Sequence, residues 1–331
     1  MTAYTKPHLS FDDQVQLLKS RGMVIDDPAA ASDLLSVVGY YRLSGYWYPY
    51  RRRLGPAQRD DRFVEGTTFA AVVRLYDTDR RLKLHVLDAI ERVEIALRVM
   101  ISFTLGKRGA YAHLNRSNLD GQFTQARGRE PSRYDEWVAK LVGAQARSTE
   151  DFVVHFQQKY DGRLPVWVVT EILDFGSTAH LYRGLKAADR NAIARDLDVV
   201  DQTGLGNGHA LGNWLRVLNY VRNICAHHSR LWNRHLVYKI ASRQLAHVSD
   251  LRHLTAPDVP PHRIYSMLCV LAFLVERVGQ GTDWASRLRQ LLSMEIPACG
   301  RSLAELGFPE GWAAHRPWAN GGAAHGRDGV V

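Results

Sequence analysis

The sequence predicts an all-α protein. Apolar residues recur at steps of three and four through several long stretches, which is the spacing of one helix face. Residues that cap helices precede many of these stretches, glycines follow them, and alternating strand patterns are scarce. With 331 residues, of which 46% are hydrophobic, the chain is long enough to bury a large core. We therefore expect a helical bundle.

Two short helices are expected at the start of the chain. Ser10 opens a capping box before a helix that ends at Gly22. Asp27, followed by proline, starts a second helix that ends near Gly39. These helices and the block after them predict an N-terminal helical extension over residues 1–66.

That block, YYRLSGYWYPYRRR from residue 40 to residue 53, interleaves aromatic residues with arginines. Aromatic rings can stack on the bases of single-stranded RNA while arginines contact phosphates. The alternative interpretation is that the rings pack the junction between the N-terminal helices and the rest of the protein. The residues proposed for RNA contact are Tyr41, Arg42, Tyr46, Trp47, Arg51 and Arg52.

A long helix is predicted over residues 67–105, with Gly106 as its end. Glu94 and Arg98 on this helix are four residues apart, where an acid before a base adds a few tenths of a kcal/mol. Glu91 belongs to the same charged set. A solvated face would explain this set, and so would an acid that orients a functional side chain.

The remaining chain, residues 67–318, is expected to form the main helical domain. Residues 107–133 are polar and rich in glycine, which indicates an exposed loop or insertion, and residues 319–331 are expected to be disordered. Pro165 opens a helix that Gly176 breaks, after which Ser177 caps the next one. The glycine-rich residues 204–213 lack the context of a phosphate loop and are expected to be a loop. Further helices are predicted over residues 134–146, 150–160, 188–197, 236–243, 263–278 and 284–292.

The stretch from Asn213 to His235 is the candidate functional helix. Its apolar residues form one stripe, whereas Asn219, Asn223 and His227 follow at steps of four off that stripe. These three residues define a polar edge, toward which the long side chain of Arg222 can reach. His228 falls on the apolar stripe, so we interpret it as a packed histidine.

Composition narrows the classes of function. The net charge of +9 suits a polyanionic partner. Three scattered cysteines indicate a reducing compartment, and no apolar run is long enough to span a membrane, so we expect a cytoplasmic protein. No cofactor is expected, and no metal, because the possible ligands do not share one face of the helix. Those possible ligands are Cys225, His227, His228 and His235.

Several strings resemble known families. Arg222 to His227 resembles the RNxxxH signature of HEPN ribonucleases. The longer string RNICAHHSRLWNR is similar to the Abi-like family of abortive-infection, phage-resistance proteins (the AbiD/AbiF group). GYYRLSGYWYPYR, ERVEIALR, LPVWVVTEILDFG and FPEGW also look like blocks of that family. The resemblance covers roughly residues 8–318 and implies a HEPN-like helical bundle.

The resemblance implies a metal-independent endoribonuclease that acts as a toxin on single-stranded RNA. His227 would be the general base or acid, Arg222 would clamp the scissile phosphate, and Asn223 would hold the imidazole or the phosphate. The expected products carry a 2′,3′-cyclic phosphate and a 5′-hydroxyl. Supporting roles are assigned to Glu94, Glu91, Arg98, His228 and Arg230, the last also as an RNA contact.

One arginine and one histidine make a small catalytic set, so we expect a homodimer in which two such edges meet. Two alternatives remain open. The first is a non-catalytic protein that holds a small structured non-coding RNA. The second is a helical interaction protein in which Arg222, Asn223 and His227 form a structural network.

Overall fold

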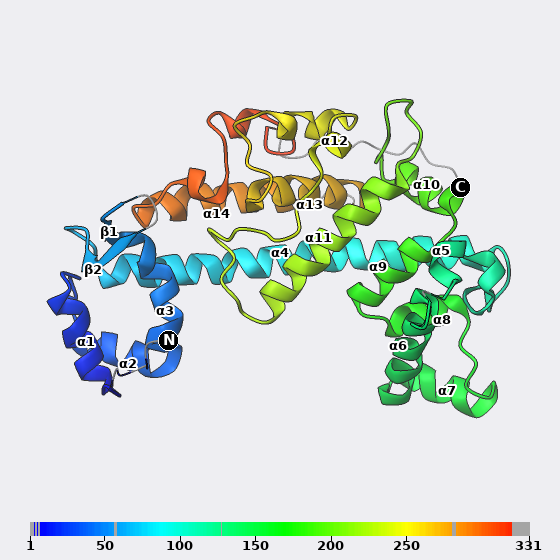
Figure 1. The fold of residues 1–331 in the computed structure, drawn as a ribbon, viewed down its shortest axis with the longest axis horizontal. Helices are drawn as coiled ribbons and strands as arrows, with labels where there is room; N and C mark the ends of the chain where they lie inside the picture. The colour runs from blue at the N-terminus through cyan, green and yellow to red at the C-terminus, as the bar shows by residue number, and fades with distance from the viewer. Residues whose placement is uncertain are drawn as a thin grey trace. The chain divides into compact units, whose positions relative to one another are not determined.

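The computed structural model describes residues 3, 5, 7–55, 58–126, 128–279 and 283–319. These segments are mainly helical, which confirms the predicted all-α class (Figure 1). Among them, the only strands are β1 (Arg51–Arg53) and β2 (Arg59–Phe63), which pair antiparallel. No helix within these segments combines the length and the apolar composition needed to cross a membrane.

The helix bounds are as follows. The first seven helices are α1 (Phe11–Ser20), α2 (Pro28–Val38), α3 (Tyr40–Trp47), α4 (Phe69–Gly106), α5 (Gly121–Thr124), α6 (Arg133–Arg147) and α7 (Asp151–Lys159). The others are α8 (Val166–Ile172), α9 (Phe175–Gly184), α10 (Ala187–Asp196), α11 (Gly208–Ala226), α12 (Ser242–Leu245), α13 (Ile264–Val278) and α14 (Trp284–Ala298).

The chain forms two compact units. The first comprises Met1–Lys83 and Arg289–Glu305, and the second comprises Leu84–Leu288 and Leu306–Val331. These units differ in extent from the predicted segments 1–66 and 67–318, which stay a prediction. The predicted disordered tail lies, apart from Ala319, outside the described residues.

The predicted caps of the first unit are confirmed. The Ser10 side chain accepts a hydrogen bond from the Asp13 amide, and Asp27 accepts one from the Ala30 amide. The core of this unit includes Asp79, which is fully buried. Its carboxylate accepts the Tyr46 hydroxyl at 2.7 Å and lies 3.2 Å from the Lys83 ammonium, so the buried charge is both paired and hydrogen-bonded.

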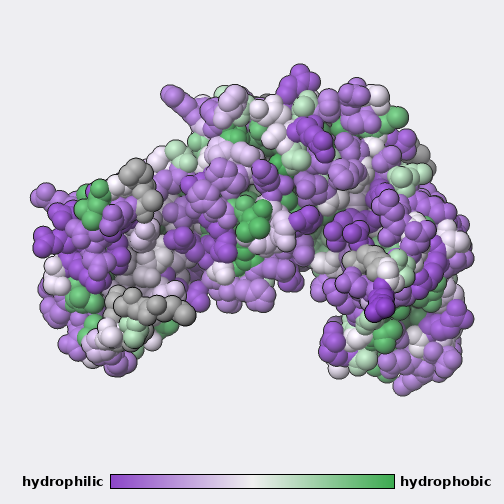
Figure 2. All heavy atoms as spheres, in the orientation of Figure 1, coloured by the Kyte–Doolittle hydropathy of each residue, from purple (hydrophilic) through white to green (hydrophobic). Residues whose placement is uncertain are grey.

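The second unit has α13 at its centre. Every residue of α13 from Ile264 to Val275 is buried, which is the burial expected of a helix that is apolar on all sides. Helix α11 packs against α13, α10 and α9, and the rings of Trp214 and Phe273 meet edge to face at 5.9 Å. Hydrophilic side chains cover most of the molecular face in Figure 2, as amphipathic helices require.

Residues 107–133 are mostly exposed where the structure describes them, as their polarity predicted, but they are not a plain loop. They contain short helical turns, and Ala112, His113 and Phe123 are buried. The Asp120 amide donates to the Gly184 carbonyl at 2.9 Å, which fastens this region to the end of α9. The few apolar residues of the segment were sufficient to anchor it because α6 and α9 supply a surface to cover.

Burial of His113 makes the stability of the protein dependent on pH. Burial lowers the pKa of His113 to about 4, and its Nδ1 has no hydrogen-bond partner among the described residues. The unfolded chain therefore binds this proton more readily, so the free energy of unfolding falls as the pH decreases from 6.5 to 4. The full effect is roughly 3 kcal/mol. Denaturant unfolding of His113→Leu should show a shallower loss over this range. An unchanged pH dependence, equal to that of a variant of the exposed His209, would contradict the assignment.

Candidate functional site

Helix α11 presents the predicted polar edge. The side chain of Asn207 caps it by accepting the Ala210 amide at 2.9 Å. The helix thus begins at Gly208, inside the region expected to be a loop. Its apolar stripe is buried, which leaves Asn219, Arg222 and Asn223 on the remaining face. Arg222 Nη1 donates to Asn223 Oδ1 at 3.4 Å.

The prediction of a single helix to His235 was wrong, because α11 ends at Ala226. The Ser229 amide donates to the Ile224 carbonyl and the His228 amide donates to the Cys225 carbonyl, both at 3.0 Å. This is a Schellman motif, in which His228 takes the left-handed position at φ 56° that glycine usually occupies. Leu231 and Trp232 follow this turn, and both are buried in the core although they lie beyond the end of the helix.

This turn also changes the placement of the two histidines. His227 is the C-terminal cap residue, and its amide still bonds the Asn223 carbonyl at 3.0 Å, one turn along the edge. Its side chain is exposed to solvent. His228 is exposed as well, so its interpretation as a packed histidine was wrong. Both imidazoles are accessible to a ligand.

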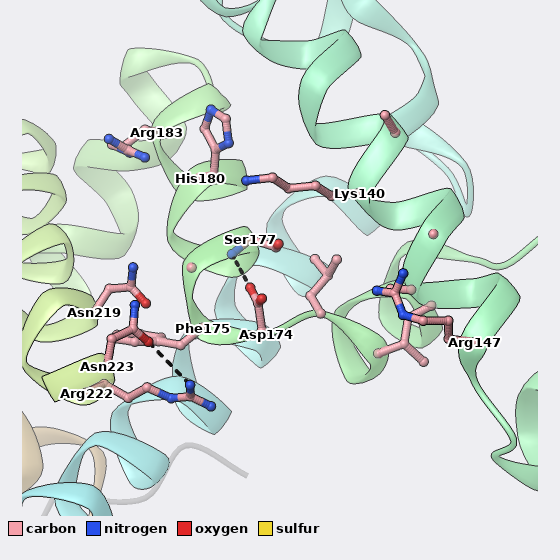
Figure 3. A pocket seen from close by; sticks show the side chains of 16 residues that line it. Lys140, Arg147, Asp174, Phe175, Ser177, His180, Arg183, Asn219, Arg222 and Asn223 are labelled. Atoms are coloured by element: carbon pink, nitrogen blue, oxygen red, sulfur yellow. Dashed lines mark hydrogen bonds between the residues drawn. The ribbon is translucent and has the colours of Figure 1, made fainter. Parts of the chain in front are cut away.

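A pocket of about 860 Å³ opens beside the polar edge (Figure 3). Its walls come from α6, from the connection between α8 and α9, from α9 and from α11. Asn219, Arg222 and Asn223 line it, whereas His227 does not. The other polar or charged side chains that line it are Lys140, Arg147, Asp174, Ser177, His180 and Arg183.

The first turn of α9 closes the pocket against α11. Asp174, rather than the predicted Ser177, caps α9 and accepts the Ser177 amide at 2.6 Å. Gly176 lies within this turn instead of breaking the helix. A Cβ atom on Gly176 would lie 3.3 Å from Asn219 Nδ2, so the absence of a side chain allows the two helices to approach closely here.

Positive charge dominates the pocket. Lys140, Arg147, Arg183 and Arg222 line it, and Asp174 is the only carboxylate among its described lining residues. Burial, together with the positive charges of Arg183 and Lys140, lowers the pKa of His180 to about 4. His180 is therefore neutral at pH 7, and two cations lie near its ring. Such a pocket suits an anionic ligand.

Glu94 and Arg98 of α4 support the pocket from outside its lining. Arg98 pairs with Glu94 at 2.6 Å and donates to the Leu173 carbonyl at 2.6 Å, next to Asp174. Burial raises the pKa of Glu94, and the positive charges of Arg98 and Arg222 oppose that rise. Glu94 thus interacts electrostatically with Arg222, whereas Glu91 is exposed to solvent.

The other residues named for this region do not converge on a metal site. Cys225 is buried, while His227, His228 and His235 are exposed. The His235 ring stacks on His262 with centroids 4.8 Å apart. Within the described part of the chain, no group of three or more His, Cys, Asp or Glu side chains could hold a metal ion. Arg230 is half-buried, and its carbonyl accepts a hydrogen bond from Arg234.

The aromatic and basic block belongs to the first unit, and much of it is core. Tyr46 is 2% exposed and Trp47 is 0% exposed, so neither ring can stack on a base, and their assignment to RNA contact was wrong. Arg51 pairs with Asp61 at 2.9 Å and Arg52 pairs with Asp60 at 2.7 Å, which partly neutralises both arginines. Of the proposed contacts in this block, Tyr41, Arg42 and Arg52 are exposed, Tyr41 by 91%.

Comparison with known proteins identifies the family. A family model described as Abi-like protein matches residues 33–233, which include the aromatic block, α4, α9 and α11. Searches of the curated proteins and of the solved structures gave no significant match. Because the matched residues make up more than half of the chain, the protein belongs to the Abi-like family of abortive-infection proteins.

Proposed function

We propose that this protein acts in abortive infection as a metal-independent endoribonuclease of the HEPN type, within the AbiD/AbiF group. The observation that carries the proposal is the cationic pocket, onto which the Arg222–Asn223 edge opens. His227 follows one turn beyond Asn223 and is exposed to a bound strand. An arginine, an amide and an imidazole supply a phosphate clamp and proton transfer from protein groups alone.

In the proposed reaction the ribose 2′-oxygen attacks the adjacent phosphorus. His227 takes the 2′-hydroxyl proton, and Arg222 offsets the negative charge that builds up on the phosphoryl oxygens. The bond from phosphorus to the 5′-oxygen breaks, and the leaving oxygen takes up a proton. The products are a 2′,3′-cyclic phosphate and a 5′-hydroxyl, so the overall step consumes no water.

This chemistry can be tested on a short RNA that the protein cuts at one position. Replacing only the nucleotide 5′ to the cut by its 2′-deoxy form removes the attacking oxygen and should abolish cleavage there. A 2′-deoxy nucleotide elsewhere in the strand should leave cleavage unchanged. Cleavage of the 2′-deoxy substrate at the original position would exclude the proposed mechanism.

A homodimer would supply a second imidazole, and one surface of α4 supports it. Ile95, Val99 and Phe103 are 52%, 58% and 67% exposed and lie at steps of four, which forms an apolar stripe. Two copies packed antiparallel about Val99 would place Ile95 against Phe103. The same register places Glu91 against Lys107, because both are eight residues from Val99. The stripe is therefore self-complementary in shape and charge.

Val99→Glu should break this dimer, because it places two carboxylates at the symmetry axis of an apolar contact. Sedimentation velocity should show a dimer for the wild type and a monomer for the variant, with cleavage reduced at least tenfold. Leu205→Glu is the control, since Leu205 is 63% exposed and lies in the loop between α10 and α11. A variant that stays dimeric, or a wild type that cuts as a monomer, would show that this surface has another role.

The position of His227 outside the pocket favours a second candidate function. In that case the pocket holds a small structured non-coding RNA and no chemistry follows. The protein would then co-purify with a defined RNA. Neither the wild type nor His227→Ala would cleave RNA, and both would bind it equally well.

A further inference from the structure

The cationic pocket is a groove with room for more than one phosphate. Its volume of about 860 Å³ is toward the upper end of the range for ligand pockets, which is about 300–1,000 Å³. The α6 wall presents Gly143 and Ala144 between Lys140 and Arg147, so small residues form a floor between two cations. The opposite walls carry Arg183 and Arg222.

Three of the four lining cations fall into two groups along α9. Asn219 lies against Gly176 in the first turn, which places the Asn219–Arg222–Asn223 edge at that end of α9. Arg183 is seven residues further on, about 10 Å along the axis at 1.5 Å per residue. Lys140 extends toward His180, one turn from Gly176, in Figure 3. Lys140 and Arg183 therefore act at one end of the groove and Arg222 at the other.

We propose that Lys140 and Arg183 form a second phosphate subsite, which holds a further phosphate of the same RNA strand that Arg222 clamps. This inference rests on the proposed function and deepens it, because it makes the substrate a strand with at least two phosphates in the groove. The neutral His180 ring between the two cations is a hydrogen-bond partner for the same phosphate. Asp174, the only carboxylate among the described lining residues, caps the first turn of α9 and disfavours a phosphate directly beside it.

The test uses the full chain and a fluorescent 2′-O-methyl oligonucleotide, whose blocked 2′-oxygen prevents cleavage. The dissociation constant is measured by anisotropy at several salt concentrations. Each neutralised phosphate of a single strand contributes about 0.7 to the slope of log affinity against log salt concentration. Lys140→Ala/Arg183→Ala should reduce the slope by about 0.7, Arg222→Ala should reduce it by a similar amount, and the triple variant should lose about 1.4.

The control is Lys239→Ala/Arg243→Ala, which removes the same charges from exposed positions outside the pocket lining. Lys140→Arg/Arg183→Lys keeps both positive charges and should therefore keep the wild-type salt dependence of binding. If Arg222→Ala lowers the slope and Lys140→Ala/Arg183→Ala behaves like the control, the subsite is wrong while the proposed function stands. If Lys140→Ala/Arg183→Ala weakens the salt dependence of binding and the wild type never cuts RNA, the subsite stands and the nuclease proposal fails. A wild type whose affinity for the oligonucleotide does not depend on salt would overturn the subsite.

Discussion

Arg222→Ala is expected to lower the rate of RNA cleavage by about 10²–10³-fold, the usual effect of removing one donor that stabilises transition-state charge. The side chain is half-exposed and makes one long hydrogen bond, so its loss should leave the melting temperature unchanged. Arg222→Lys keeps the positive charge but loses the planar guanidinium group. Its cleavage rate should therefore lie between those of the wild type and Arg222→Ala. The measurement is single-turnover cleavage beside a melting curve for each variant. Wild-type rates in a folded Arg222→Ala protein would remove Arg222 from the catalytic set.

His227→Ala is expected to lower cleavage by about 10²–10⁴-fold, the range for loss of a general acid or base. RNA binding should persist, because His227 lies outside the pocket lining. The matched control is His228→Asn, which removes the neighbouring exposed imidazole at a left-handed position that asparagine tolerates. Equal losses in both variants would mean that the turn itself, rather than the His227 ring, is required.

The start of the fold could be predicted because its signals are local. Ser10 and Asp27 each cap a helix through a hydrogen bond that spans three residues, so the signal lies within a short stretch of sequence. The end of α11 could not be predicted in this way. Its Schellman motif uses His228 where the sequence gives no glycine, and the turn is stabilised by burial of Leu231 and Trp232. Those contacts are tertiary.

The candidate site shows the same division. Helical periodicity placed Asn219, Arg222 and Asn223 on one edge, and the structure keeps them together. The cations opposite them come from α6 and α9, at sequence distances over which no periodicity applies. Lys140, Arg147, His180 and Arg183 were therefore missed, although Lys140, His180 and Arg183 lie on predicted helices.

The aromatic block shows how one pattern can serve two purposes. Interleaved rings and arginines indicated RNA stacking, but burial decided between that interpretation and packing. Tyr46 reaches the buried Asp79 carboxylate, and Trp47 is enclosed in the core of the first unit. Composition cannot reveal which rings of such a block face inward.

The most direct test of the central claim is cleavage of single-stranded RNA by the purified wild-type protein in EDTA, with the ends of the products identified. We expect cleavage that EDTA does not inhibit, fragments that end in a 2′,3′-cyclic phosphate and a 5′-hydroxyl, and cleavage by folded His227→Ala that is lower by at least about 10²-fold. Cleavage that stops in EDTA, or products with a 3′-hydroxyl and a 5′-phosphate, would contradict that claim.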